Sequence, residues 1–307
     1  MGILNLIDMK RVFSLIVMLL YSLAWCYSQE NAFELSKLKS GHYAFPVKLN
    51  NQLEATALLE SGIPAMLVDS AFVFNNLDKL ALEWMPTDKK EKINLGGRVY
   101  SISHKVKGKM AISKDVTYEG DIFVLARYNQ PYEVAIPIQN LALKKKRSVL
   151  FLDMNNNLLK VCRAKQIADI KEYQKMAINT DTYLNMPAIK MKMQVDIGRE
   201  STPLDGNFVI DFGNPMFLFL HAHNKNNISW IEGNNIELQK AYNKEGKVVA
   251  QAFMPKTCRM GNLEFKSVPI AITSSLPRFT SEGNLGLKFF QHVIAVFDFG
   301  KGYCYMK

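Results

Sequence analysis

The stretch that decides the fold class is residues 207–213, with the sequence NFVIDFG, in a chain of 307 residues. Phe208, Val209 and Ile210 form an apolar, partly β-branched run that favours a buried strand. The run ends at Asp211, and Gly213 allows a tight backbone turn two residues later. Apolar residues then resume at 216–220, so a strand, an acidic turn and a second strand are predicted here.

The first half of the chain repeats this pattern. Residues 45–49 (FPVKL) precede a turn at Asn50 and Asn51, and residues 55–62 (ATALLESG) form the strand that ends in an acid, one further residue and Gly. Apolar residues follow again at 66–68. In the second half, residues 186–191 (MPAIKM) are the matching first strand.

Both halves also close alike. An apolar strand that ends on Asp is followed by a turn and a last apolar strand, at residues 149–153 and 158–161, and again at 295–299 and 303–305. Matching patterns in the same order at both ends of both halves predict a duplicated lobe. Many short strands bounded by turn residues favour a barrel or sandwich class.

With these motifs the chain resembles the aspartic peptidase superfamily, the pepsin and retropepsin group, over about residues 41–307. The C-terminal stretches 283–290 (GNLGLKFF) and 296–298 (VFD) look very like the close of a pepsin-type lobe. The resemblance is to exported bacterial variants with degenerate catalytic motifs. It implies an all-β, bilobed pepsin-like fold with two related six-stranded-type β-barrel lobes.

The resemblance places the two catalytic carboxylates at Glu60 and Asp211. In the family, two such acids share a proton and activate a water molecule, because two adjacent like charges cannot both ionise cheaply. Ser61 and Gly62 match the first motif and Gly213 matches the second. Asn214 is the candidate for steadying the second acid.

Four departures from the family pattern weaken a catalytic interpretation. Glu60 is one methylene longer than Asp, and Phe212 stands where a hydroxyl should brace the pair. Ile63-Pro64 removes a small polar residue, and residues 135–139 (AIPIQ) stand where the first lobe should carry an apolar-apolar-Gly segment. The sequence therefore predicts a non-catalytic homologue that binds an extended peptide or similar ligand in the inter-lobe cleft. The alternative is an active aspartic endopeptidase in which Glu60 and Asp211 activate water.

A hairpin with a Gly96-Gly97 turn, followed by Tyr100, is the candidate for a substrate-covering flap. An ordinary surface hairpin is the simpler interpretation and is favoured. Helices are predicted only at residues 169–177 and 70–82.

The predicted domain organisation is a signal peptide at 1–28, an N-terminal lobe at 29–180 and a C-terminal lobe at 181–307, with the lobe boundary near 178–185. Lys10 and Arg11 precede an apolar run at 12–25, which is the layout of a secretory signal.

The run is shorter than the ~20 residues that span a membrane, so no stable span is expected after cleavage. Export to the periplasm or the medium is predicted. Lipidation at Cys26 is less favoured, because Trp25 occupies a position that needs a small residue.

The formal net charge is +10, but Lys and Arg are spread along the chain, which disfavours nucleic-acid binding. Cys162, Cys258 and Cys304 permit one disulfide at most. His221 and His223 share one face if they lie on a strand, yet no third ligand is evident, so no metal site and no cofactor are predicted. The expected partner is a peptide or protein ligand, and the chain is expected to be a monomer.

Overall fold

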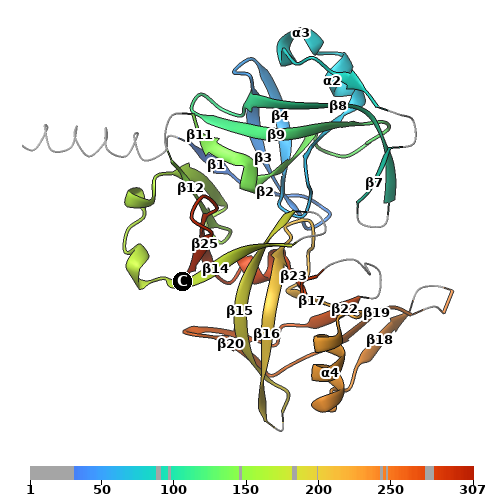
Figure 1. Ribbon diagram of the computed structural model, residues 1–307, viewed down its shortest axis with the longest axis vertical. Coiled ribbons are helices and arrows are strands. Elements are labelled where there is room, and N and C mark those ends of the chain that lie inside the picture. The colour runs from blue at the N-terminus through green and yellow to red at the C-terminus, as the bar shows by residue number, and fades with distance from the viewer. Residues whose placement is uncertain are drawn as a thin grey trace, which may run out of the picture.

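The computed structural model describes residues 31–87, 91–95, 98–144, 147–181, 185–198, 200–242, 245–246, 248–273 and 280–307. The predicted signal peptide, with Cys26, lies outside them and stays a prediction. Strands dominate the described residues and build two lobes, one above the other in Figure 1. The prediction of an all-β, bilobed fold is confirmed.

The first lobe contains a sheet of ten described strands. They are β2 (Ser36–Lys37), β3 (Tyr43–Leu49), β4 (Leu53–Glu60), β5 (Met66–Asp69), β6 (Met85–Pro86), β7 (Lys92–Leu95), β8 (Arg98–Ala111), β9 (Val116–Leu125), β10 (Val134–Pro137) and β11 (Leu141–Leu143). Its path runs β2-β3-β4-β10-β5-β9-β8-β6, with β11 beside β9 and β7 beside β8.

The second lobe is built from ten further described strands. They are β14 (Gln174–Asp181), β15 (Met186–Asp196), β16 (Ser201–Ile210), β17 (Leu218–His221), β18 (Gln239–Tyr242), β19 (Val248–Phe253), β20 (Thr257–Met260), β21 (Leu263–Lys266), β22 (Ile270–Thr273) and β23 (Gly283–Leu285). The path runs β14-β15-β16-β23-β17-β22-β19-β18, and β20 pairs with β15 and β21.

The strand order of the two lobes shows the duplication directly. In the first lobe β3-β4-β10-β5-β9-β8 pair in the sequence antiparallel, parallel, antiparallel, parallel, antiparallel. In the second lobe β15-β16-β23-β17-β22-β19 pair in the same sequence. In each lobe a later strand is inserted between the strand that ends near the acid and the strand that follows it. The duplicated lobe predicted from the repeat is confirmed.

A linking sheet joins the two halves. It is formed by β1 (Ala32–Glu34), β13 (Leu158–Cys162), β12 (Val149–Asp153), β24 (Ile294–Asp298), β25 (Tyr303–Met306) and β14, in that order. The closing hairpins of the halves meet where β12 pairs antiparallel with β24. The lobe boundary near 178–185 stays a prediction; β14, which ends at Asp181, pairs with β25 on one side and with β15 on the other.

The helices are short. They are α2 (Ser70–Phe74), α3 (Leu77–Leu80), α4 (Lys225–Gly233) and α5 (Leu287–Phe290), with 3-10 turns at Ile138–Asn140, Ala164–Gln166 and Ile170–Glu172. None of these helices is long and apolar enough to cross a membrane. The helical prediction for residues 70–82 is confirmed as the two pieces α2 and α3.

The helical prediction for residues 169–177 is wrong. Only one 3-10 turn forms there, and β14 begins at Gln174. Asp169 has a φ of 51°, which lies outside the helical region. The partners of β14 on both edges offer the backbone more hydrogen bonds than an isolated helical turn, so tertiary pairing decides the structure.

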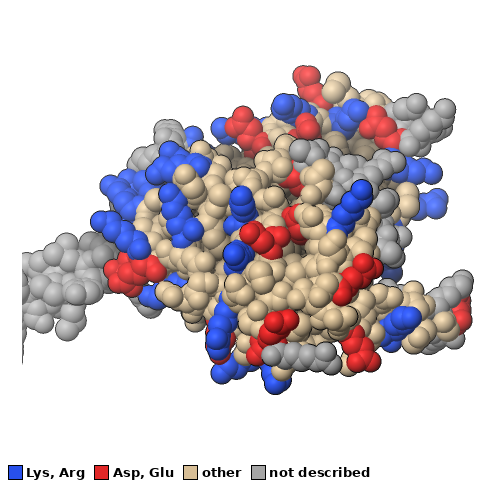
Figure 2. All heavy atoms as spheres, turned by 60° about the horizontal axis from the view of Figure 1, so that its bottom comes forward, with Lys and Arg blue, Asp and Glu red and all other residues tan. Residues whose placement is uncertain are grey.

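The surface charges are dispersed, as the sequence predicts. On the face shown in Figure 2, Lys and Arg side chains are spread over the surface, with Asp and Glu among them. The three cysteines of the described chain, Cys162, Cys258 and Cys304, are buried and free.

An aromatic cluster forms the core beneath the second acidic loop. Phe212, Phe290 and Phe297 are fully buried, with ring centroids 4.8 Å apart for Phe212 and Phe290 and 5.9 Å apart for Phe290 and Phe297. Phe297 lies on β24, so this cluster ties the linking sheet to the acidic loop of the second lobe.

Replacing Phe297 tests how much this cluster stabilises the fold. We expect Phe297→Ala to lower the free energy of unfolding by about 3–5 kcal/mol, because a buried aromatic side chain is lost and a cavity is left. Val99→Ala, at a position 61% exposed, is the control and should change it by less than about 0.5 kcal/mol. Urea unfolding measures both, and a similar effect of the two changes would contradict the packing argument.

Candidate functional site

The two predicted acids meet where the lobes join. β4 ends at Glu60, and Asp211 follows β16 directly. A Cβ atom on Gly62 would lie 2.6 Å from Asp211 Oδ1, and a Cβ atom on Gly213 would overlap Glu60 Oε1. Each carboxylate therefore rests on the glycine of the opposite loop, and only glycine leaves room for it.

The Ser61 hydroxyl fastens the first loop to the second. Ser61 Oγ donates to the carbonyl oxygen of Ile210 at 2.8 Å and accepts from the amide of Phe212 at 3.1 Å. Ser61 is fully buried, so both hydrogen bonds are shielded from water. One hydroxyl thus holds the two acidic loops in register.

The reciprocal hydroxyl is missing, because Phe212 occupies its position. The Phe212 ring packs against Phe290 and Phe297 in the aromatic cluster, and Pro64 is exposed. A hydroxyl on the second loop would accept a hydrogen bond from the amide of Ser61. In its absence, this amide donates to Glu60 Oε2 at 3.2 Å. The additional methylene of Glu60 lets its carboxylate take this donor, so the longer acid compensates for the missing hydroxyl.

Asp211 is held by a residue that the sequence did not predict. Asn284 on β23 donates from Nδ2 to Asp211 Oδ2 at 2.7 Å. That Asn214 steadies this acid stays a prediction; its backbone amide donates to the carbonyl oxygen of Asp211 at 3.1 Å. Asn214 Oδ1 accepts from the amide of Met216 at 3.0 Å, and its buried Nδ2 has no hydrogen-bond partner among the described residues.

His42, from the first lobe, braces the second acidic loop. Its Nε2 donates to the carbonyl oxygen of Gly213 at 2.9 Å, and its Nδ1 lies 3.0 Å from Ser40 Oγ. Its position next to the pair helps to stabilise the charge of Asp211 and so opposes the rise in the pKa of that carboxyl.

The environment favours one proton on the acid pair. Burial, followed by the charge of Asp211, raises the pKa of Glu60 to about 8. Burial also raises the pKa of Asp211, but the hydrogen bonds from Asn284 and Gly213 and the charge of His42 oppose that rise. Glu60 therefore holds the proton near neutral pH, and Asp211 is the better site for the negative charge.

In the first lobe, β10 occupies the position where the sequence lacks the apolar-apolar-Gly segment. β10 lies between β4 and β5 as β23 lies between β16 and β17. Just beyond β10, Gln139 Nε2 donates to the carbonyl oxygens of Ser61 and Ile63 at 3.3 and 3.4 Å. A side chain thus supports the first acidic loop, whereas in the second lobe Gly286 packs closely against the backbone of Asn214 and Met216.

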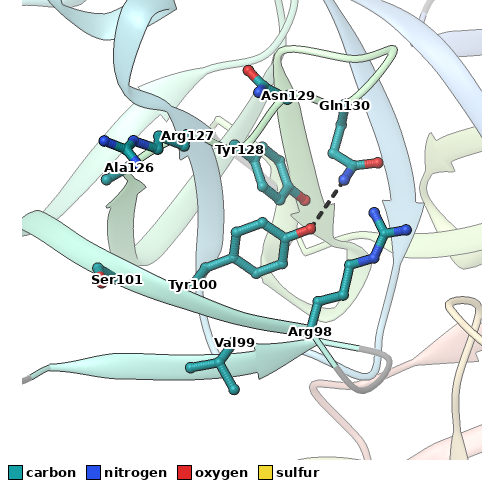
Figure 3. Close-up of a pocket in the computed structure, with 9 residues that line it drawn as sticks. All are labelled: Arg98, Val99, Tyr100, Ser101, Ala126, Arg127, Tyr128, Asn129 and Gln130. Atoms are coloured by element: carbon teal, nitrogen blue, oxygen red, sulfur yellow. Dashed lines mark hydrogen bonds between the residues drawn. The ribbon is translucent and has the colours of Figure 1, made fainter.

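A cavity of about 750 Å3 opens between the β7–β8 hairpin and the segment after β9 (Figure 3). Gln130 donates to the Tyr100 hydroxyl at 3.1 Å, and the rings of Tyr100 and Tyr128 lie 5.4 Å apart. Neither Glu60 nor Asp211 lines this cavity, and the charge of Glu60 is a minor cause, after burial and Tyr132, of the raised pKa of Tyr128.

The predicted hairpin is confirmed: β7 and β8 pair antiparallel, with Leu95 opposite Arg98 at one end and Lys92 opposite Ser101 at the other. Gly96 and Gly97 of the flap candidate lie outside the described residues. Tyr100 is the described member of that candidate, and it lines the cavity.

His221 and His223 stack on one another, with ring centroids 5.6 Å apart. Within the described ranges, no group of three or more His, Cys, Asp or Glu residues could hold a metal ion. His221 instead forms hydrogen bonds to Asn284 and Ser281, so its role lies within the protein network around Asp211.

Comparison with known proteins adds one finding. No family model and no curated protein matches the sequence. Among solved structures, the chain is similar to the crystal structure of the aspartic proteinase from Irpex lacteus, with a TM-score of 0.54 over 90% of this chain and 96% of that chain. The chain has the fold of a pepsin-like aspartic proteinase. At 10% sequence identity, the similarity to that proteinase concerns the fold alone.

The brace formed by Ser61 can be tested by stability. We expect Ser61→Ala to lower the free energy of unfolding by about 1–3 kcal/mol, because it leaves the amide of Phe212 and the carbonyl of Ile210 without the hydroxyl. Ser61→Thr keeps a hydroxyl and should lose less. The exposed Ser101→Ala is the control in urea unfolding, and an effect of Ser61→Ala no larger than that control would contradict the brace.

The raised pKa of Glu60 predicts a pH dependence of stability. Between about pH 4.5 and 8 the folded chain keeps a proton on Glu60 that the unfolded chain has lost. The free energy of unfolding should therefore fall as pH rises through this window. We expect Glu60→Gln to make this fall shallower, whereas Glu54→Gln, at an exposed position on the same strand, leaves it unchanged. Urea unfolding at pH 5 and pH 8 measures the slope; equal slopes in the three proteins would refute the assignment.

Proposed function

We propose that this chain is an aspartic-type peptidase that binds an extended peptide between its lobes and hydrolyses it with water activated by Glu60 and Asp211. The main support for this proposal is that the Asp211 carboxylate lies against Gly62 and the Glu60 carboxylate lies against Gly213, across the junction. Two buried acids in such contact hold one proton between them, which supplies a general base and a general acid in the same place.

The charge distribution assigns the roles. Asp211, ionised and held by Asn284, takes a proton from the attacking water. Glu60, protonated, donates its proton to the oxygen of the scissile carbonyl, and the water oxygen bonds to the carbonyl carbon. In the second step the proton on Asp211 passes to the amide nitrogen, the carbon–nitrogen bond breaks, and a hydroxyl proton of the diol returns to Glu60.

Two contacts support catalysis against the objections raised by the sequence. The Phe212 ring packs in the aromatic core, 4.8 Å from the ring of Phe290. The Glu60 carboxylate accepts a hydrogen bond from the amide of Ser61, which has no hydroxyl partner. The extra methylene of Glu60 allows this contact within the loop. Both departures were reasons to expect a non-catalytic protein, and each has a local structural compensation.

The cavity at Tyr100 and Tyr128 supports an extended ligand. It is lined by polar groups and aromatic faces and lies along the edge of β8 near Arg98 (Figure 3). A peptide in extended form can add backbone hydrogen bonds along such an edge and place side chains in the cavity. We propose that this part of the cleft receives a side chain of the substrate.

A non-catalytic peptide-binding protein is the second candidate. One observation favours it: Ser61 supplies a bridging hydroxyl from the first loop but Phe212 supplies none from the second, so the pair is held less symmetrically than two hydroxyls would hold it. Loss of positional precision at reacting groups can lower a rate on the order of a hundredfold. Export remains part of both proposals, on the basis of the predicted signal at residues 1–28.

Hydrolysis of a mixed peptide library from pH 3 to 8 tests the proposal. We expect cleavage by the unaltered protein and a loss of at least ~10³-fold in Asp211→Asn and in Glu60→Gln, because each removes one acid–base group. The matched control is Asp205→Asn, at an exposed position on β16, the strand that leads to Asp211. This variant should cleave normally.

Absence of cleavage by folded protein at every pH would overturn the peptidase proposal. Peptides retained by that folded protein, measured by mass spectrometry after gel filtration, would then favour the second candidate.

A further inference from the structure

Behind Asp211, buried polar side chains continue the hydrogen-bonding of the acid pair into the second lobe. Asn284 on β23 is 7% exposed, and His221 at the end of β17 is 1% exposed. Asn284 Nδ2 lies 2.7 Å from Asp211 Oδ2, Asn284 Oδ1 lies 2.8 Å from His221 Nε2, and His221 Nδ1 lies 3.0 Å from the carbonyl oxygen of Ser281. β16, β23 and β17 are neighbouring strands, so the sheet itself sets this order.

The donors and acceptors of this chain fix the proton positions. The Ser281 carbonyl oxygen can only accept, so His221 Nδ1 carries a proton. Asn284 Oδ1 can also only accept, so Nε2 of the same ring must carry a second proton. This arrangement therefore joins a cationic His221 to an ionised Asp211 through the amide of Asn284.

Rotating the amide of Asn284 by half a turn gives a second satisfied arrangement. Its NH2 group then donates to Nε2 of a neutral His221, and its oxygen accepts from Asp211, which must carry a proton on Oδ2. A cationic His221 can also coexist with an Asp211 protonated on Oδ1, because Oδ2 still accepts from Asn284. Only a neutral His221 with an ionised Asp211 places an acceptor against an acceptor. This mismatch leaves a buried polar group unpaired, which costs about 1–3 kcal/mol.

We propose that Asn284 acts as an amide relay that links the protonation of Asp211 to that of His221, so that His221 is a positioning residue for the acid pair. An ionised Asp211 requires a cationic His221, and Glu60 then keeps the proton of the pair. That is the state in which Asp211 can take a proton from water, so the effect of the relay on activity rests on the proposed function. The linkage itself does not.

The surroundings of His221 lower its pKa on balance, so the cationic state depends on the groups that oppose this effect. Burial lowers the pKa of His221, and the nearby charge of His223 acts in the same direction. The hydrogen bonds to Ser281 and Asn284 and the charge of Asp181 raise it. Asp181 itself accepts from the amide of Ser281 at 3.0 Å, which holds the carbonyl that receives the Nδ1 proton.

Three more of the described residues contribute charge around the relay. Glu282, next to Ser281 in the chain, is buried, and its carboxylate accepts from the amide of Asn207 at 2.7 Å and from Asn226 at 3.2 Å. On the far side of the relay, Asp211 faces Glu60 and His42. The relay is therefore the hydrogen-bonded path between the acid pair and His221.

Ring-nitrogen NMR of the full chain tests the linkage without any measurement of activity. We expect Asp211→Asn to lower the proton affinity of His221 at least tenfold, which appears as a fall of one pH unit or more in its titration midpoint. In Asn284→Leu the relay is absent, so adding Asp211→Asn should produce less than half of that shift. The titration of His292, which is exposed in the same lobe, is the control and should not change.

Three outcomes would overturn the relay. One is an unchanged His221 titration in Asp211→Asn. Another is an equal shift in the presence and absence of Asn284, which would mean that the effect passes through space. The third is a neutral His221 in the unaltered protein while Asp211 is ionised. Each is read from the NMR signals even if the protein cleaves no peptide, so failure of the peptidase proposal is distinguishable from failure of the relay.

The activity profile gives a second readout. His221→Gln removes the cation that favours an ionised Asp211, so the acidic limb of the kcat/KM profile should move to higher pH, whereas His292→Gln should leave it in place. A uniform loss of activity with an unchanged profile would indicate a purely structural role and would contradict the relay.

Discussion

The structure depends on two glycines, each of which lies directly against the carboxylate of the opposite loop. This contact is possible only without a Cβ atom, so Gly62 and Gly213 set the distance between the lobes at the site. The contact also holds the two acids together away from water, and burial, followed by the charge of Asp211, raises the pKa of Glu60. The geometry of the backbone and the chemistry of the pair thus have one origin.

The two halves solve the same structural problem with different residues. In the first lobe, Ser61 supplies the bridging hydroxyl and Gln139 supports the loop from outside. In the second lobe, Phe212 gives up the hydroxyl for a place in the aromatic core, and Asn284 holds the acid. Glu60 then accepts the hydrogen bond from the amide of Ser61, which lacks a hydroxyl partner. The asymmetry of the pair, with the proton on Glu60 and the charge on Asp211, follows from these unequal supports.

The sequence predicts the architecture well because duplication leaves a pattern that repeats: both acid-x-Gly turns and both closing hairpins lie where the repeat places them. The direction of the Phe212 ring was not predictable, since a fully apolar environment arises only when β24 and α5 fold against it. Asn284 stands in the middle of the short strand Gly283–Leu285, and this was the one available sign of a buried polar role. Nothing local marks His42, whose partner Gly213 lies in the other half of the chain. The erroneous helix at 169–177 has the same cause, because the pairing partners of β14 are distant in sequence.

The linking sheet has a consequence for how this chain can change over generations. β12 and β24 are equivalent strands of the two halves, and they are joined by a ladder of main-chain hydrogen bonds. Such a ladder makes few demands on side-chain identity beyond an apolar face. Mutations can therefore accumulate independently in the two acidic loops while the halves stay docked. A symmetric ancestor is free to become a protein in which one half specialises in holding a proton and the other in holding a charge.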